Sequence, residues 1–338
     1  MLSHWFSPID NTLSHLAGNY CQIMYEDGKD FPVLEHTKLA FIGFDKEFSN
    51  NVRKQFYSFN NHFSPLQIAD LGNLKSLDVE FSIPAIKEIL DGGIIPILLG
   101  APGHIIQKLM HRLESDSSTI FHISNRLPDY HSDDKYEILG FQRHLCELDR
   151  ITQLEGISTS SMSLAKMRAH PYIQEAVLRD ANLTHFDGSA IKLSDNPASI
   201  ESNTSGLTCA ESCQVMKNIG GSQNLKLLNI TNYEIIDEKR QYASSITIAE
   251  MIWYFIEGYN GRKGDYPFAS KKDYDRFTVL INEGEHELVF YRSNLSERWW
   301  IEVPVKAESK HLSSDRHQLV PCSYDDYLRA CENDIPVR

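Results

Sequence analysis

The chain has 338 residues, 41% of them hydrophobic and 23% charged, which is enough for one large buried core or two smaller ones. Its formal net charge of -13, without a dense Lys/Arg cluster, argues against nucleic acid as a partner, because proteins that bind nucleic acids present basic surfaces. No apolar run approaches the roughly 20 residues that a membrane-spanning helix requires, so no membrane span is expected.

Apolar runs alternate with helical patterns in the first half of the chain. Strands are predicted over residues 38–44, 66–70, 94–99 and 119–123. Helices are predicted over 51–60, over 79–90 and from about 104 to 112, and the mixed segment before residue 37 could hold one more, over 13–24. Such alternation indicates crossover connections and a mainly parallel sheet with helices on both faces.

The second half continues this alternation less regularly. Strands are predicted over 136–141, 151–157, 183–186 and 225–230, and helices over 163–179, 208–221 and 246–257. Pro171 should kink or divide the first of these helices. Thr208 and Glu211 form the capping box at the start of the second, and Gly220-Gly221 ends it.

From Gly261 onward the pattern changes to short antiparallel strands. Residues 276–281 and 287–291 predict a hairpin, to which 299–303 could add a third strand, and no final element is predicted after them. Large aromatic side chains on these strands need a partner surface, so we expect Tyr291 and at least one of Trp299 and Trp300 to be buried. We therefore divide the chain into an N-terminal segment (1–37), an α/β domain (38–262) and a C-terminal β extension with a tail (263–338).

The six cysteines are scattered and include no C-x-x-C motif. The N-terminus has neither a basic start nor the apolar core of a signal peptide, so we expect reduced thiols and a cytoplasmic location. Cys209 and Cys213 lie four residues apart on one face of a predicted helix and could supply half of a metal site. We favour the simpler interpretation that they are two small residues on the buried face of that helix.

The strand over 94–99 ends in the turn Gly100-Ala-Pro-Gly103, and strand ends of this kind are where α/β proteins build their sites. The turn lacks the nucleotide-loop patterns G-x-x-x-x-G-K-[ST] and G-x-G-x-x-G. Its sequence, Ile-Pro-Ile-Leu-Leu-Gly-Ala-Pro-Gly-His, resembles the Ile-Pro-Ile-x-Leu-Gly-Gly-Asp-His-Ser element of the arginase/agmatinase/formimidoylglutamase (ureohydrolase) family. Ser205-Gly-Leu-Thr-Cys-Ala-Glu211 is similar to that family's G-G-L-T-x-x-E, and the segments 249–255 and 262–267 look like those of a bacterial arginase-like branch.

The resemblance covers residues 38–259 and implies a three-layer α/β/α fold. It also implies two manganese ions, which in that family generate the hydroxide that attacks a guanidino or formimino carbon. The family's ligand positions fall on Gly103, Ser124, Arg126, Pro128, Asp187 and Ser189. Asp187 alone keeps a ligand side chain, Arg126 brings a permanent positive charge, and the family's substrate-positioning Glu falls on Asn232. We therefore expect neither a metal cofactor nor hydrolysis by this route.

Two other arrangements could replace the lost site. His104, His122 and His185 could hold zinc together with Asp187, although His122 should point away and His104 should pack locally. Without a metal, the Asp187 carboxylate would need a partner in a closed pocket, and we expect Arg126 to pair with it, directly or through one water molecule. The alternative is that Arg126 turns to solvent and Asp187 caps backbone amides. A serine hydrolase is not indicated, since no G-x-S-x-G motif is present.

These observations predict a catalytically inactive ureohydrolase-fold protein that acts as a binding or scaffolding component. Its partner should be a protein, and it could also assemble with copies of itself. Two alternatives remain open. One is a metal-dependent hydrolase of linear amidines, amidinohydrolase-like or formimidoylglutamase-like, with unusual ligands. The other is a metal-free sensor of a small guanidino compound.

Overall fold

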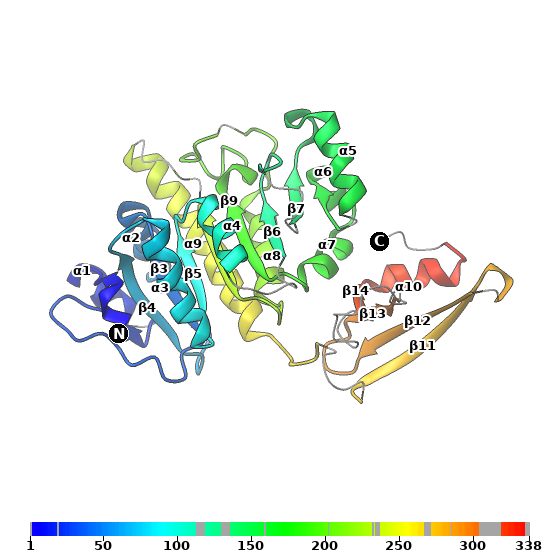
Figure 1. The fold of residues 1–338 in the computed structure, drawn as a ribbon, viewed down its shortest axis with the longest axis horizontal. Coiled ribbons are helices and arrows are strands. Elements are labelled where there is room, and N and C mark those ends of the chain that lie inside the picture. Colours follow the sequence, from blue (N-terminus) through cyan, green and yellow to red (C-terminus); the bar gives the residue numbers. More distant parts are fainter. Residues whose placement is uncertain are drawn as a thin grey trace.

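The computed structural model describes residues 2–18, 20–112, 119–129, 136–158, 160–201, 203–231, 233, 237–266, 272–284, 286–303 and 319–334. In this part of the chain, one sheet of ten strands lies between helices, and a second sheet of four strands lies at the C-terminal end (Figure 1). The strands of the large sheet are β1 (Phe6–Ser7), β2 (Ile23–Met24), β3 (Leu39–Gly43), β4 (Ile68–Leu74), β5 (Ile95–Leu99), β6 (Ile120–Ile123), β7 (Tyr136–Phe141), β8 (Met162–Ser163), β9 (Leu183–Asp187) and β10 (Leu227–Thr231).

The large sheet is parallel except at one edge. Its strand order is β1-β4-β3-β5-β10-β9-β6-β7-β8, and β2 also pairs with β4. Among the described strands of this sheet, β1 alone runs antiparallel, with Phe6 opposite Leu74. Inner strands are covered on both faces, which explains why all five residues of β5 are buried and apolar or proline. The segment before residue 37 thus contributes β1 and β2 to the sheet.

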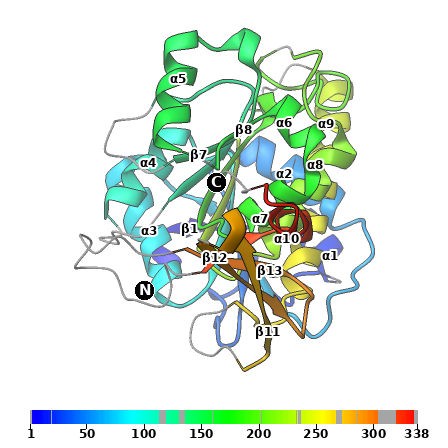
Figure 2. The same ribbon diagram turned by 90° about the vertical axis from the view of Figure 1, so that its right-hand side faces the viewer.

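Helices cover the large sheet in two layers, as the sequence predicts (Figure 2). One layer contains α3 (Val79–Asp91), α4 (Gly103–Arg112) and α5 (Leu148–Ile157). The other contains α2 (Lys46–Phe56), α6 (Leu164–Ala169), α7 (Pro171–Leu178), α8 (Cys209–Gly220) and α9 (Glu238–Asn260), with α1 (Asn11–Ala17) beside α2. No described helix combines the length and the apolar composition that crossing a bilayer demands.

Several predicted elements change in length or type. Residues 151–157, predicted as a strand, belong to α5, because Ile151 and Leu154 are spaced for one helix face and pack on the sheet. The helix predicted over 13–24 is shorter and is followed by β2. The helix predicted over 163–179 is divided before Pro171 into α6 and α7, and the capping box of Thr208 and Glu211 is confirmed.

The C-terminal sheet is antiparallel, in the order β11-β12-β13-β14. It consists of β11 (Tyr274–Ile281), β12 (His286–Ser293), β13 (Trp299–Glu302) and β14 (Leu319–Cys322), and α10 (Tyr324–Cys331) packs against it. The first three strands were predicted, whereas β14 and α10 were not. Tyr291 and Trp299 are each 7% exposed and Trp300 is 1% exposed, which confirms their predicted burial.

Arg179, at the end of α7, joins the α/β body to the C-terminal sheet. Its Nη1 donates to the Trp299 carbonyl oxygen at 2.8 Å and its Nη2 to that of Cys322 at 3.3 Å. The guanidinium lies over the Trp300 ring, 5.3 Å from its centroid, and Glu175 neutralises the charge with an Nη2–Oε2 distance of 2.5 Å. Trp300 therefore contacts the α/β body through Arg179, whereas the aromatic rings of the C-terminal sheet otherwise pack mainly on one another and on α10.

Candidate functional site at the carboxyl ends of the strands

The carboxyl ends of β5, β10, β9 and β6 meet at one edge of the large sheet, where doubly wound proteins bind ligands. The register pairs Thr231 with Asp187 at the ends of β10 and β9, and the turn at Gly100 follows β5. A hollow of about 280 Å³ opens here. It is lined by Asp45, Phe48, Gly100, Asp187, Ile200, Thr231 and Tyr233.

Of the six predicted ligand positions, Asp187 is the one that lines this hollow. Its Oδ1 accepts a hydrogen bond from the backbone N–H of Ser189 at 2.8 Å. Gly103 is the first residue of α4, and a Cβ added there would lie 3.5 Å from Cε1 of His185. The hydroxyl of Ser124 donates to the carbonyl oxygen of Arg126, so it caps its own turn. Asp187 and Ser124 each have a hydrogen bond within the turn that follows their strand.

Arg126 and Asp187 do not form the direct pair that the sequence analysis predicts as one possibility. Nε of Arg126 donates to Oε2 of Glu201 at 3.1 Å, and Nη1 donates to the carbonyl oxygen of Leu145 at 3.1 Å. The Arg126 side chain is 53% exposed, so the guanidinium keeps part of its hydration while it pairs with Glu201. Pairing inside a closed pocket would have required removing both charges from water, which costs several kcal/mol per ion. The alternative arrangement, with Arg126 outward and Asp187 capping an amide, is the one present.

His122 and His185 stack on neighbouring strands, with ring centroids 4.8 Å apart and planes 3° apart. Burial lowers the pKa of both imidazoles, and their like charges lower that of His122 further, whereas Asp187 partly offsets the effect at His185. Nδ2 of Asn229 lies 2.9 Å from Nδ1 of His185 and also donates to the Ala101 carbonyl oxygen, so the ring accepts this bond through Nδ1. Burial therefore favours the neutral form of both rings.

These histidines line a second hollow of about 220 Å³, together with Gly103, His104 and Pro128. Asp187 lines the first hollow instead, so the structure does not assemble the alternative zinc site of three histidines and Asp187. Within the described ranges, one group of three His, Cys, Asp or Glu side chains has its ligand atoms within 4.8 Å of one another, and it lies elsewhere, on α8 and α9.

The donor set at the carboxyl edge does not fit a pair of manganese ions. Such hard cations take carboxylate and imidazole ligands, and two ions need several of them. Gly103 and Pro128 offer no side-chain donor, and the other carboxylate that lines the hollow, Asp45, caps α2 by accepting the Phe48 N–H at 2.7 Å. Asn232, where the family's substrate-positioning Glu falls, lies outside the described residues.

Two residues of the site were not found from the sequence. Glu201, the partner of Arg126, lies 75 residues away in a loop that carries no motif. Tyr233 lines the hollow and donates to the Gln241 carbonyl oxygen at 2.9 Å, and burial raises its pKa. A lone acidic or aromatic loop residue gives no periodic signal, so neither could be predicted.

Solved structures with the same arrangement decide the fold. A formiminoglutamase from Trypanosoma cruzi, solved with manganese, has a TM-score of 0.59 at 15% identity and covers 68% of this chain and 96% of its own. An arginase superfamily protein from Trypanosoma cruzi gives 0.58 at 14% identity, covering 68% and 95% of the two chains. The chain has an arginase-like fold. The agmatine ureohydrolase of Thermoplasma volcanium agrees, with a TM-score of 0.53 at 16% identity over 67% of this chain and 91% of its own. No protein-family model and no curated protein matches the sequence.

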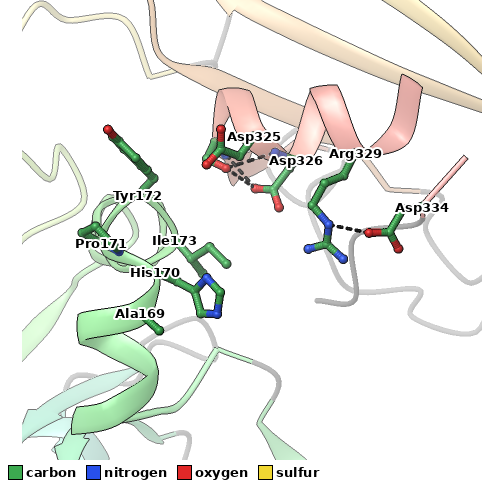
Figure 3. Close-up of a pocket in the computed structure, with 10 residues that line it drawn as sticks. Ala169, His170, Pro171, Tyr172, Ile173, Asp325, Asp326, Arg329 and Asp334 are labelled. Carbon is green, nitrogen blue, oxygen red and sulfur yellow. Dashed lines mark hydrogen bonds and ion pairs between the residues drawn. The ribbon is translucent and has the colours of Figure 1, made fainter. Parts of the chain in front are cut away.

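A third hollow lies where the arginase-like body meets the C-terminal sheet (Figure 3). It measures about 540 Å³ and is open to solvent. The junction of α6 and α7 contributes His170 and Tyr172 from one side, and α10 contributes Asp325 and Arg329 from the other. Arg329 also pairs with Asp334 at 2.7 Å. This groove joins an exposed aromatic ring to charges of both signs.

Proposed function

We propose that this chain uses an arginase-like fold without manganese-dependent hydrolysis and acts as a binding or scaffolding component. The observation that carries the proposal is the donor set at the carboxyl edge, where Asp187 is the one carboxylate left among the six ligand positions. The likeness in fold is equally compatible with an active hydrolase of linear amidines, so the proposal rests on these residues. The groove beside Tyr172, which is 68% exposed, supports contact with a protein partner.

Hydrolysis measured with added manganese separates this proposal from the hydrolase alternative. The purified full-length chain, with excess Mn²⁺, is offered formimino and guanidino substrates, and the metal bound per chain is determined. We expect no turnover above that of the Asp187→Ala variant, which lacks the last carboxylate. Stoichiometric manganese together with turnover that Asp187→Ala abolishes would establish the hydrolase instead.

A second candidate function is a metal-free sensor of a small guanidino compound. The hollow at the strand ends favours it, because Asp45 and Asp187 provide two carboxylates and Phe48 an aromatic ring. Carboxylates bind guanidinium through paired hydrogen bonds, and an aromatic face attracts cations. A thermal-shift series with guanidinium, agmatine and arginine should raise the melting temperature in the native chain and not in Asp187→Asn. Equal shifts in both proteins would rule this candidate out.

A further inference from the structure

Two cysteines and a glutamate converge between α8 and α9, on the helical layer rather than at the strand ends. Cys209 and Cys213 are one turn apart on α8, so their side chains share a face, and their Sγ atoms lie 4.0 Å apart. Glu250 reaches them from α9, with Oε2 3.1 Å from Sγ of Cys209. All three ligand atoms lie within 4.8 Å of one another.

These separations are close to those of donors around a single tetrahedral metal ion. With zinc–sulfur bonds of about 2.3 Å and zinc–oxygen bonds of about 2.0 Å at the tetrahedral angle, two sulfurs lie about 3.8 Å apart and a sulfur and an oxygen about 3.5 Å apart. The Sγ–Sγ distance of 4.0 Å and the Sγ–Oε2 distance of 3.1 Å differ from these values by a few tenths of an ångström. Small side-chain movements would therefore bring the three donors onto one ion.

Among the described residues, no positively charged side chain pairs with the three side chains of this cluster. No Lys or Arg of the described residues pairs with Glu250. The neighbouring carboxylate, Asp195, accepts the Cys209 backbone N–H at 2.8 Å and pairs with Lys192 at 3.3 Å. The hydrogen-bonded Cys213 thiol, burial and Glu250 all raise the pKa of Cys209. A bound divalent cation would instead favour the thiolate forms, because the cysteine ligands of a metal ion bind it without their protons.

We propose that Cys209, Cys213 and Glu250 form a zinc site whose fourth ligand is water. Thiolate donors select zinc over manganese, so this site is independent of the proposed loss of manganese chemistry. Cys209 and Glu250 are both partly exposed, which gives an ion and a water molecule access. Because the ligands come from two helices, a bound zinc ion would cross-link the first turns of α8 to α9. The C-x-x-x-C spacing would then reflect metal binding as well as packing.

Cobalt is the probe for this site, because Co²⁺ bound by thiolates absorbs in the near ultraviolet and shows the visible bands of tetrahedral coordination. The full-length chain is reduced, freed of metal with a chelator, and titrated with Co²⁺ and then with Zn²⁺. We expect a thiolate band that saturates at one Co²⁺ per chain and disappears as Zn²⁺ displaces it. Zinc should also raise the melting temperature in a concentration-dependent way.

Three variants identify the ligands. Cys213→Ser should weaken the thiolate band. Glu250→Gln keeps the side-chain shape and should weaken Zn²⁺ binding by at least roughly 10-fold, because even substitution of a residue that only orients a metal ligand costs about that much affinity. The double variant Cys146→Ser/Cys331→Ser removes two thiols outside the cluster and should bind as the native chain does. Circular dichroism confirms that each variant is folded. A native chain without the band, or a folded Cys213→Ser with an unchanged band, overturns the proposal.

Discussion

At the scale of single residues, one ion pair between helix α2 and the large sheet has almost no access to water. Arg53 on α2 and Asp70 on β4 are 1% and 0% exposed, and they meet through two hydrogen bonds of 2.7 and 2.9 Å. Arg53 also donates to Asn73 and to the Gly72 carbonyl oxygen, and the Tyr57 hydroxyl donates to Asp70. Every charge is thus compensated, which is the condition under which a buried pair is tolerated.

Asp70→Asn should destabilise the protein by on the order of 3 kcal/mol, because it leaves the Arg53 guanidinium buried without a counter-charge. Urea unfolding followed by circular dichroism measures the change. Glu155→Gln is the matched control, since Glu155 pairs with Arg143 on the surface, where both side chains are more than half exposed. Its unfolding midpoint should stay where it is. Equal effects of the two substitutions would contradict the role assigned to burial.

The stacked histidines should make stability depend on pH. Burial lowers the pKa of His122 and His185 in the folded state, so below about pH 6.5 the unfolded chain binds protons that the folded chain does not. The contribution that the two neutral histidines make to the free energy of unfolding is therefore present above about pH 6.5 and is lost as the pH falls below it. His122→Gln should reduce the loss of stability between pH 7 and pH 5, measured by urea unfolding, whereas His36→Gln, at an exposed position, should leave it unchanged.

The candidate site was predictable from the sequence in position but not in detail. Asp187 ends the short strand predicted over 183–186, so its place at a strand end could be inferred from the local sequence. The partner of Arg126 could not be inferred from the sequence, because a long flexible side chain can reach several carboxylates. The carboxylate that it meets, Glu201, is distant in sequence. The sequence places Cys209 and Cys213 on one helix face, but Glu250, the third residue of the cluster, comes from another helix.

At the scale of elements, local sequence predicts best where a motif is short and self-contained. The capping box of α8 forms as expected, with Thr208 Oγ1 accepting the Glu211 N–H at 3.1 Å and Glu211 accepting the Thr208 N–H at 2.7 Å. By contrast, residues 151–157 of α5 were mistaken for a strand, because so short a segment does not distinguish the helical period from the strand period. Likewise, α10 was missed although Ser323 and Asp326 form a capping box there too.

Thr208→Ala should destabilise the metal-free protein by about 1 kcal/mol, the usual cost of losing an N-cap hydroxyl. Thermal unfolding in the presence of chelator measures it. Thr152→Ala serves as the control, because that hydroxyl bonds back to the Leu148 carbonyl oxygen within an exposed helix face and caps no amide. A loss of the same size in Thr152→Ala would show that the capping interaction is not responsible.

At the scale of the whole molecule, the alternation of strands and helices predicts a parallel sheet but not the order of its strands. That order depends on which edges meet, and β10 enters between β5 and β9, which lie far apart in the sequence. Burial of Trp299 and Trp300 could be expected from their size alone. Their partners could not be predicted. Trp299 stacks on Tyr327 of α10, an element that the sequence analysis did not predict. The Trp300 ring lies beneath the guanidinium of Arg179, which comes from the end of α7.

Arg179→Met should loosen the C-terminal sheet from the body. The substitution keeps the apolar stem but leaves Glu175 with Arg298 as its remaining ion-pair partner and the Trp299 carbonyl oxygen without its donor, at a cost of about 2 kcal/mol. Limited proteolysis should then release the sheet earlier than in the native protein. Arg276→Met removes a surface pair with Glu287 and should leave the rate of release unaltered. Identical digestion of both variants would show that Arg179 does not hold the sheet.

The central place of β10 also governs the order in which a growing chain can complete its core. Leu228 lies opposite Ile97 of β5 on one side and Thr184 of β9 on the other, so both of those strands keep an unpaired inner edge until residues 227–231 have been synthesised. Such edges promote aggregation, because their unpaired N–H and C=O groups can form hydrogen bonds with a strand of another chain. Chains released before residue 227 should therefore aggregate, and the nascent protein needs protection until its last central strand arrives.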